Sequence, residues 1–418
     1  MTDSSHAASL AEVCIIGAGP VGATLGALLA AAGVTVAVID AAPLPPMEMP
    51  AFDGRAYAIA ATSRNLLDAA GIWARLPAEP CAIRAIRVAD GRPGEAPSHL
   101  SLHFDAADAG EEAFGWMIEA RALRVALNAR LPGMANLSVF APTEATVERD
   151  AEGATVTLTN GHRITARLVV AAEGRRSPLR RGAGIGEAGF DYHQMGLVGA
   201  FAHERPHDGL ALEQFLPNGP FAQLPMTGTA EHPNLSAYVW SDRTDIAKAA
   251  LDLTDAGFGR ELRRRMGGHL GAVTPVGRRW SYPLTAMHVQ RLTDTRLAIV
   301  GDAAHGIHPI AGQGLNLGFR DVAALAEAVI EAVNAGEDPG GASVLARYQA
   351  ARRGDNLVML GATHALERLF GNDLAPIRAA RRLGIGAVDR MPALKRWFAR
   401  RAMGFGGVSG GLLAGRGV

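Results

Sequence analysis

The sequence predicts an α/β protein in which a doubly wound nucleotide-binding domain carries an inserted lobe of antiparallel sheet. Three observations support this fold class. A glycine-rich turn follows a buried strand near the N-terminus, a second strand and glycine-rich loop occur roughly 280 residues later, and short alternating apolar stretches lie between the two. With 418 residues, 48% of them hydrophobic, the chain is long enough to form two domains.

The first element is a strand, turn and helix at residues 13–32. Residues 13–39 carry no charge, and length alone would permit a membrane span, but glycines divide the run into strand, turn, helix, turn and strand, as in a buried βαβ unit. The second strand, 34–39, ends in Asp40, 18 positions beyond Gly22, where a carboxylate can accept hydrogen bonds from an adenosine ribose. The turn has the pattern G-x-G-x-x-G, and the residues assigned to a pyrophosphate site are Gly17, Gly19, Pro20 and Gly22.

This Rossmann-type motif binds a dinucleotide because its glycines let the backbone approach the pyrophosphate, whose charge then faces the N-terminal amides of the helix. The motif does not separate FAD from NAD, so an NAD-dependent dehydrogenase stays open at this point. A carboxylate at position 40, rather than an arginine, disfavours only a 2′-phosphate.

Composition and charge exclude several classes of function. The formal net charge is zero, so no overall field favours nucleic acid, and we expect no nucleic-acid partner. Cys14 and Cys81 are the only cysteines, which excludes a disulfide framework or a cysteine-based zinc site and suits a reducing cytoplasm. The N-terminal residues lack the basic and apolar regions of a secretory signal, so we expect a cytoplasmic protein.

The second informative segment lies far downstream. Residues 296–300 form another apolar strand that leads into Gly301 and Asp302, then into a glycine-rich loop and a helix that continues to about Ala335. A carboxylate at the carboxyl end of a strand can hydrogen-bond a polyol such as a ribityl chain. A helix that begins after Gly312 would direct its positive end, about half an elementary charge, at a ligand that becomes negative on reduction.

Within this segment, the stretch HPIAGQGLNLGFRDVAALAE resembles the signature of the ubiquinone-biosynthesis hydroxylases, which belong to the group A flavoprotein monooxygenases. The resemblance covers most of the chain. It implies an FAD-binding domain of the aromatic-hydroxylase type, FAD as cofactor, O₂ as co-substrate, and an external reductant that is either NAD(P)H or a ferredoxin-type donor. It also implies ring hydroxylation of a polyprenylated phenol, with other ubiquinone-biosynthesis proteins as possible partners.

The resemblance also assigns roles to the loop residues. His305 would belong to the flavin loop, and Pro309 would lie near the reactive face of the ring. His305 and His308 have the spacing H-x-x-H, but no third ligand cluster accompanies them, so we expect no metal site. The other loop residues that the resemblance assigns to the cofactor are Gly301, Asp302, Gly312, Gly314, Leu315 and Asn316.

A third segment, residues 168–178, resembles the family's DG motif, which serves both FAD and the reduced nicotinamide. The usual aspartate is Glu173 here, one methylene longer, so the charge is kept while its position changes. The resemblance further assigns Arg55 to the edge of the flavin and Arg121 to the ribityl or phosphate region of the cofactor. No acid–base residue is assigned, because the flavin carries the oxygen chemistry.

Residues 186–290 carry alternating stretches, such as 197–202 and 235–240, that predict strands of an antiparallel sheet. We expect them to form the substrate lobe, with residues 1–185 and 291–365 forming a discontinuous FAD-binding domain. Residues 215–226 resemble the family's substrate-lobe segment, where an apolar wall faces the flavin. The candidates for that wall are Phe221, Leu224, Pro225 and Met226, for which the ordinary hydrophobic core is the alternative.

The C-terminal region, residues 366–418, is predicted to be basic and helical. Between Ala375 and Met403 there are eight basic residues and one acidic residue, with apolar residues among them. Such a basic amphipathic helix can lie on an anionic membrane surface, which would place the protein peripherally on the inner face of the membrane. It can equally pack on a partner protein or present a solvated face.

Three functions stay open from the sequence. The resemblance favours a ubiquinone-pathway ring hydroxylase. The alternatives are a hydroxylase of a soluble phenol on the same fold, and a non-enzymatic FAD-binding scaffold in which Glu173 prevents use of the electron donor.

Overall fold

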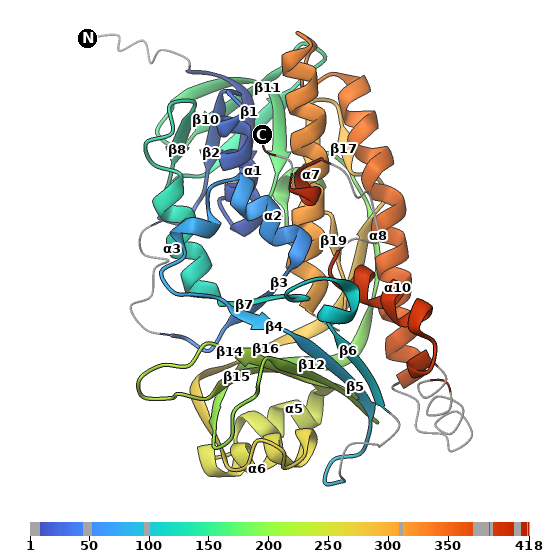
Figure 1. The fold of residues 1–418 in the computed structure, drawn as a ribbon. Helices are drawn as coiled ribbons and strands as arrows, with labels where there is room; N and C mark the ends of the chain where they lie inside the picture. The colour runs from blue at the N-terminus through green and yellow to red at the C-terminus, as the bar shows by residue number, and fades with distance from the viewer. Residues whose placement is uncertain are drawn as a thin grey trace.

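The structure is a computed structural model, and it describes residues 9–44, 52–95, 101–308, 312–370, 384, 388–404, 411–415 and 417. It confirms the α/β fold. A domain built on a twisted sheet and long helices occupies the upper half of Figure 1, and a second sheet with two helices beneath it occupies the lower half. None of the described helices is long and apolar enough to cross a membrane.

Eight strands of the described chain form the central sheet of the upper domain. The neighbours β8, β2, β1, β11 and β18 run parallel, and they are rich in buried aliphatic residues because helices and loops cover both faces. The strand order is β17 (Thr293–Asp294), β18 (Leu297–Ile299), β11 (Arg163–Ala171), β1 (Ser9–Ile16), β2 (Val36–Ile39) and β8 (Leu137–Phe140). In addition, β10 (Ala154–Leu158) pairs with β11, and β9 (Ala145–Arg149) pairs with β10.

This topology brings the three sequence motifs to one edge. The strands β1, β11 and β18 are adjacent and parallel, and their carboxyl ends lead into the turn at Gly17, the segment at Glu173 and the loop at Gly301. Ligands bind at this edge of an open α/β sheet. The predicted strands and helices at these motifs are present; β1 begins four residues before the predicted start at Val13, and the other predicted ends differ by one or two residues.

Helices cover the central sheet and define the upright shape seen in Figure 1. α1 starts at a proline directly after the glycine turn, where the missing N–H costs no hydrogen bond, and it packs against α3 and α7. α7 in turn packs against the long α8. The helices of this domain are α1 (Pro20–Ala31), α2 (Ala61–Ala69), α3 (Ala120–Arg130), α4 (Pro178–Gly182), α7 (Gln313–Asn334) and α8 (Ala342–Phe370).

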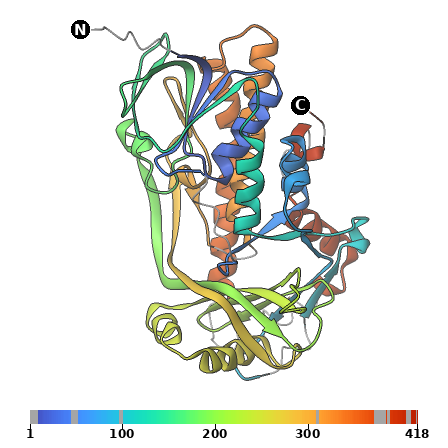
Figure 2. The same ribbon diagram turned by 90° about the vertical axis from the view of Figure 1, so that its left-hand side faces the viewer.

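The lower lobe is built on a second sheet of eight strands among the described residues, and its two longest strands reach up to the first domain (Figure 2). Those strands are β12 (Glu187–His203) and β16 (Val273–Val289). The order is β19 (His305–Gly306), β16, β12, β15 (Leu235–Arg243), β14 (Gly219–Met226), β13 (Leu210–Leu216), β5 (Ala85–Asp90) and β6 (Ser101–Asp105). On its outer face lie α5 (Thr244–Leu251) and α6 (Asp255–Met266).

Two features of this sheet differ from the sequence prediction. Strands β5 and β6 come from residues 85–105, which the prediction placed in the FAD-binding domain, and β13 pairs with β5 in parallel. The sheet is therefore mixed and draws on chain outside residues 186–290. A small sheet of β3 (Ala56–Ala60), β7 (Gly115–Glu119) and β4 (Cys81–Ile83) lies between the two parts.

The C-terminal region forms helix α10 (Pro392–Ala402) and a short turn at Gly411–Ala414. Ala399 and Met403 are buried in a hydrophobic cluster with Ala61 and Trp116, so α10 is anchored to the body of the protein. The amide of Leu412 donates to Glu327 of α7 at 2.8 Å. Leu383 and Ile385, two of the apolar residues between Ala375 and Met403 in the predicted basic helix, lie outside the described residues.

Candidate active site

The first βα turn and the distant glycine loop are in contact, although 280 positions separate Val21 from Gly301. A Cβ at Gly301 would lie 3.1 Å from a methyl group of Val21, and one at Gly318 would lie 2.8 Å from the same side chain. Glycine at both positions therefore lets α1, α7 and the loop approach closely. The two motifs assigned to the cofactor from the sequence meet in space.

Each glycine of the first turn is needed for a different structural reason. Gly17 has a φ of 109°, and a Cβ there would lie 2.4 Å from the carbonyl oxygen of Ala172, directly after β11. A Cβ at Gly22 would lie 2.0 Å from the carbonyl oxygen of Gly17, whereas one at Gly19 would meet nothing within 4 Å. Gly17 and Gly22 thus permit the tight turn, and Gly19 leaves its backbone open to a ligand.

Asp40 and Arg124 brace this turn. One carboxylate oxygen of Asp40 accepts from the amide of Ala18 at 2.7 Å, and the other accepts from the amide of Ala42 at 2.8 Å. Arg124 of α3 donates to the carbonyl of Ala18 at 2.5 Å. Its role was not predicted, because an arginine on a helix gives no local signal of a contact 106 positions away. Ribose binding by Asp40 remains a prediction.

A cavity of about 610 Å³ opens between the glycine loops and the lobe sheet. The loop side supplies backbone amides and one exposed carboxylate, that of Asp302. The sheet side is mostly apolar, as a site for an aromatic ring requires. Residues of the loop side include Gly19, Pro20, Arg55, Gly174, Arg175, Asp302, His305, Gly312, Gly314 and Leu315, and residues of the sheet side include Val198, Leu224, Val239, Trp280, Tyr282 and Leu284.

This donor set fits FAD. A glycine turn at a helix N-terminus suits a pyrophosphate, and the carboxylate of Asp302 suits a polyol. The N-terminus of α7, with Gly312 at a φ of 62°, faces the same cavity and suits a ring that gains negative charge. Pro309, expected near the reactive face of the ring, lies outside the described residues.

Two other predicted residues, Asn316 and Arg121, do not line the cavity. The side chain of Asn316 is buried, accepting from the amide of Ala60 and donating to the carbonyl of Ala58, both at 2.9 Å, so it clamps the start of α7 to β3. Arg121 pairs with Glu119 at 3.7 Å and does not line the cavity. Cofactor contacts of both side chains stay predictions.

Glu173 points into its own loop. Its carboxylate accepts from the hydroxyl of Ser177 and, at 3.3 Å, from the amide of Leu179, so it stabilises the start of α4. Burial raises the pKa of this carboxyl. The neighbouring Gly174 and Arg175 line the cavity, whereas Glu173 does not. A contact between Glu173 and either FAD or an electron donor remains a prediction.

Arg55 is held in place at the mouth of the cavity. Its guanidinium donates twice to Asp53, from Nε at 2.9 Å and from Nη2 at 2.6 Å. The same guanidinium lies 4.4 Å from the ring centre of Trp280, and Arg278 lies 4.3 Å from that centre. Trp280 was not predicted, because nothing local distinguishes it from a core aromatic residue. These contacts bring positive charge to the edge of an otherwise apolar wall.

Strand alternation divides the four predicted wall residues. Leu224 lines the cavity, and Met226 on the same face of β14 packs in the cluster with Trp116. Phe221 is fully buried on the opposite face against α6. Pro225 has the same parity as Phe221. The sequence prediction took the four together, but a period of two places only alternate residues toward the cavity.

The two histidines of the H-x-x-H pattern point to different partners. Nε2 of His305 lies 2.6 Å from Asp321, and Nε2 of His308 lies 3.2 Å from the amide oxygen of Gln194. Burial lowers the pKa of His308 to about 4, so this ring is neutral at physiological pH. In the described part of the chain, no group of three or more His, Cys, Asp or Glu residues could hold a metal ion.

Solved structures with a similar fold include two monooxygenases. The chain resembles p-nitrophenol 4-monooxygenase PnpA from Pseudomonas putida, with a TM-score of 0.75, 18% identity, and coverage of 96% of this chain and 99% of that one. It also resembles PqsL, a probable FAD-dependent monooxygenase from Pseudomonas aeruginosa, with a TM-score of 0.74, 24% identity, and coverage of 90% and 99%. Residues 10–356 match the family described as FAD binding domain. The fold and site define an FAD-dependent monooxygenase.

Sequence relatives narrow the family. The chain is 49% identical to ubiquinone hydroxylase UbiL of Rhodospirillum rubrum, over 96% of this chain and 91% of the relative. It is 34% identical to 3-demethoxyubiquinol 3-hydroxylase of Escherichia coli, over 94% and 98%. The chain belongs to the ubiquinone-biosynthesis hydroxylase family of FAD-dependent monooxygenases. Enzymes of this class consume O₂ and an external reductant.

Proposed function

We propose that this enzyme hydroxylates the aromatic ring of a polyprenylated phenol in ubiquinone biosynthesis. The observation that supports the proposal is the cavity. Its loop side, formed by the first glycine turn and the loop at Asp302, faces an apolar sheet wall that includes Leu224, Val198 and Val239. A phenol ring fits between such a wall and a flavin. The ubiquinone hydroxylases to which the chain is similar support the substrate class.

Named residues would perform the steps that belong to the protein. Bound flavin, once reduced, supplies the activation of O₂ and the transfer of one oxygen atom. The loop at Asp302 and the N-terminus of α7 would hold the cofactor, while Leu224 and Val239 would orient the substrate ring and exclude water. Arg55, fixed by Asp53, would keep a positive charge at the mouth of the cavity.

Quinone analysis in a strain of the source organism that lacks the protein tests the proposal. We expect ubiquinone to fall and a polyprenyl phenol with one ring hydroxyl fewer to accumulate, and the position of the missing hydroxyl would name the step. Reintroduced wild-type protein should restore ubiquinone, whereas the Asp302→Ala variant should not. Normal ubiquinone in the deletion strain, without a second hydroxylase, would refute the proposal and would favour a soluble phenol as substrate.

We further propose that α8 and α10 dock the enzyme on an anionic membrane surface, from which it takes its substrate. Of the eleven exposed large hydrophobic side chains in the described residues, seven lie on these two elements or directly beside them. They are Leu357, Val358, Leu366, Leu369, Met391, Trp397 and Phe398. Arg368 and Arg396 are exposed among them and complement an anionic surface.

Vesicle sedimentation tests the docking surface. The holoenzyme should bind vesicles that contain phosphatidylglycerol and should bind pure phosphatidylcholine vesicles several-fold more weakly. The double change Trp397→Ser and Phe398→Ser should reduce binding to the anionic vesicles at least fivefold. Leu253→Ser removes an exposed apolar side chain from the turn between α5 and α6, outside the proposed surface, and serves as the control. Equal binding by all variants would refute this surface.

A further inference from the structure

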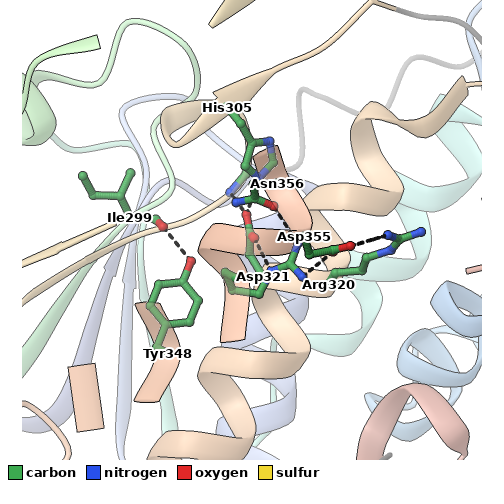
Figure 3. Close-up of polar contacts among 9 residues, drawn as sticks. Ile299, His305, Arg320, Asp321, Tyr348, Asp355 and Asn356 are labelled. Carbon is green, nitrogen blue, oxygen red and sulfur yellow. Dashed lines mark hydrogen bonds and ion pairs between the residues drawn. The ribbon is translucent and has the colours of Figure 1, made fainter. Parts of the chain in front are cut away.

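One buried carboxylate behind the cavity joins four elements of the chain. Asp321 of α7 is fully buried. Its Oδ2 accepts from the amide of Gly301 at 2.9 Å and lies 2.6 Å from Nε2 of His305 (Figure 3). Its Oδ1 accepts from Nε of Arg352, on α8, at 2.8 Å. The loop after β18, strand β19 and helices α7 and α8 therefore meet at one carboxylate.

The charge of this carboxylate is balanced through a short chain of pairs. Arg352 also donates to Asp355 at 2.6 Å and to the side chain of Asn356 at 2.8 Å, and Asp355 pairs with Arg320 at 3.3 Å. Figure 3 shows Asp355 and Asn356 near Asp321, with Arg320 on the far side of Asp355. Burial alone would raise the pKa of Asp321, but His305 and Arg352 outweigh burial and hold it at about 2.

The two groups that Asp321 holds belong to the cofactor loop. Gly301 has a φ of 63° and directly precedes Asp302, the exposed carboxylate of the cavity. His305 lines the cavity at the other end of the same loop. Asp321 itself does not line the cavity, so it touches neither cofactor nor substrate. It can act on them only by fixing the loop from behind.

We infer that Asp321, held by Arg352, is the positioning residue of the flavin loop. By fixing the backbone at Gly301 and the ring of His305, it sets where Asp302 meets the cofactor. Loss of the Asp321 carboxylate should weaken FAD binding. It should also raise the share of reducing equivalents that reach O₂ as hydrogen peroxide without hydroxylation of the substrate. The inference rests on FAD binding in this cavity and does not depend on the identity of the substrate.

The variant Asp321→Asn tests this inference because it keeps the size of the side chain and removes its charge. Tyr348→Phe is the matched control. The Tyr348 hydroxyl is also buried on α8 and donates to the carbonyl of Ile299 at 2.7 Å, one residue before the loop region begins at Val300. It stabilises the same part of the fold without touching Gly301 or His305. Both variants are compared with wild type as apoprotein and as holoenzyme.

Three measured quantities distinguish a positioning role of Asp321 from a contribution to the stability of the fold alone. They are the thermal midpoint of the apoprotein, the Kd for FAD by quenching of flavin fluorescence, and the peroxide released per reductant oxidised. We expect Asp321→Asn to raise the Kd tenfold to a hundredfold and to raise peroxide release several-fold. Tyr348→Phe should lower the midpoint with a Kd within threefold of wild type. The FAD titration needs no substrate, so it reports on this inference even where the proposed substrate is wrong.

Two results would overturn the inference. One is a Kd for Asp321→Asn within threefold of wild type. The other is a rise in Kd that both variants share in proportion to their loss of thermal midpoint, which would make Asp321 structural only. If Asp321→Asn does not fold, Arg352→Lys carries the test, since it keeps the charge but loses the planar donors to Asp321 and Asn356. A fivefold higher Kd supports the inference, and an unchanged Kd overturns it.

Discussion

Removing the Asp302 carboxylate tests FAD binding independently of the stability of the fold. The side chain of Asp302 is exposed in the cavity, and among the described residues it forms no hydrogen bond or ion pair. Asp302→Ala should therefore leave the stability of the apoprotein almost unchanged. A hydrogen bond to a charged group contributes about 1.5–3 kcal/mol, so loss of this carboxylate should weaken FAD binding roughly tenfold to a hundredfold.

The assay is a titration of apoprotein with FAD, followed by flavin fluorescence and by the thermal midpoint at each step. Asp108→Ala, an exposed aspartate in the turn at 107–109 and outside the cavity, is the control. Its Kd and midpoint should match wild type. A Kd for Asp302→Ala within twofold of wild type would remove Asp302 from the site and contradict the placement of the cofactor. A large fall in the apoprotein midpoint would contradict the view that this carboxylate serves only a ligand.

Further predictions concern the wall, the lobe and the buried charges. Leu224→Trp should raise KM for the phenol at least tenfold with an unchanged Kd for FAD, since Leu224 lines the cavity from the sheet side; equal KM values would count against that wall. Burial raises the pKa of Glu213 to about 8, so its folded form favours the neutral acid, and stability falls as pH rises toward 8. Glu213→Gln should then stabilise the protein at pH 9 by about 1–3 kcal/mol and less at pH 5 by chemical denaturation, and no gain at pH 9 would refute this. The pKa of Asp321 is lowered from 3.8 to about 2, so its ionised form stabilises the fold above pH 4, and that contribution, about 2 kcal/mol, is lost as pH falls through 2. Asp321→Asn should lack this pH dependence.

The sequence predicted which segments come together where the structural signal is local, while the contacts of their residues with FAD stay predictions. A glycine turn between a strand and a helix fixes its own backbone, and the carboxyl ends of parallel strands lie at one edge of the sheet. Together with the family resemblance of the downstream loop, this predicted that the first turn and the loop at Asp302 meet, and Gly19 and Asp302 line one cavity. Residues that reach the site only through tertiary contacts were not predicted. Trp280 and Arg124 reach the site only because distant strands and helices fold against it.

The substrate lobe was predicted less well, for two physical reasons. Strand alternation divides Leu224 from Phe221, but the direction of each face depends on packing against α6, which the residue pattern does not contain. Strands β5 and β6 join the lobe sheet from residues 85–105 because a sheet edge pairs with any strand that the chain brings beside it. Residues 85–105 thus lie in the lobe sheet although the prediction placed them in the FAD-binding domain, and the remaining domain boundaries stay a prediction.

Transfer of one oxygen atom from O₂ to a polyprenyl phenol tests the central claim most directly. Purified holoenzyme is reduced with dithionite without air, which avoids the choice of electron donor, and is then mixed with the phenol under ¹⁸O₂. The proposed function predicts a product with one added ring hydroxyl that carries ¹⁸O, formed by wild type and lost in Asp302→Ala. Unlabelled phenol recovered intact, with all reducing equivalents appearing as peroxide, would contradict it.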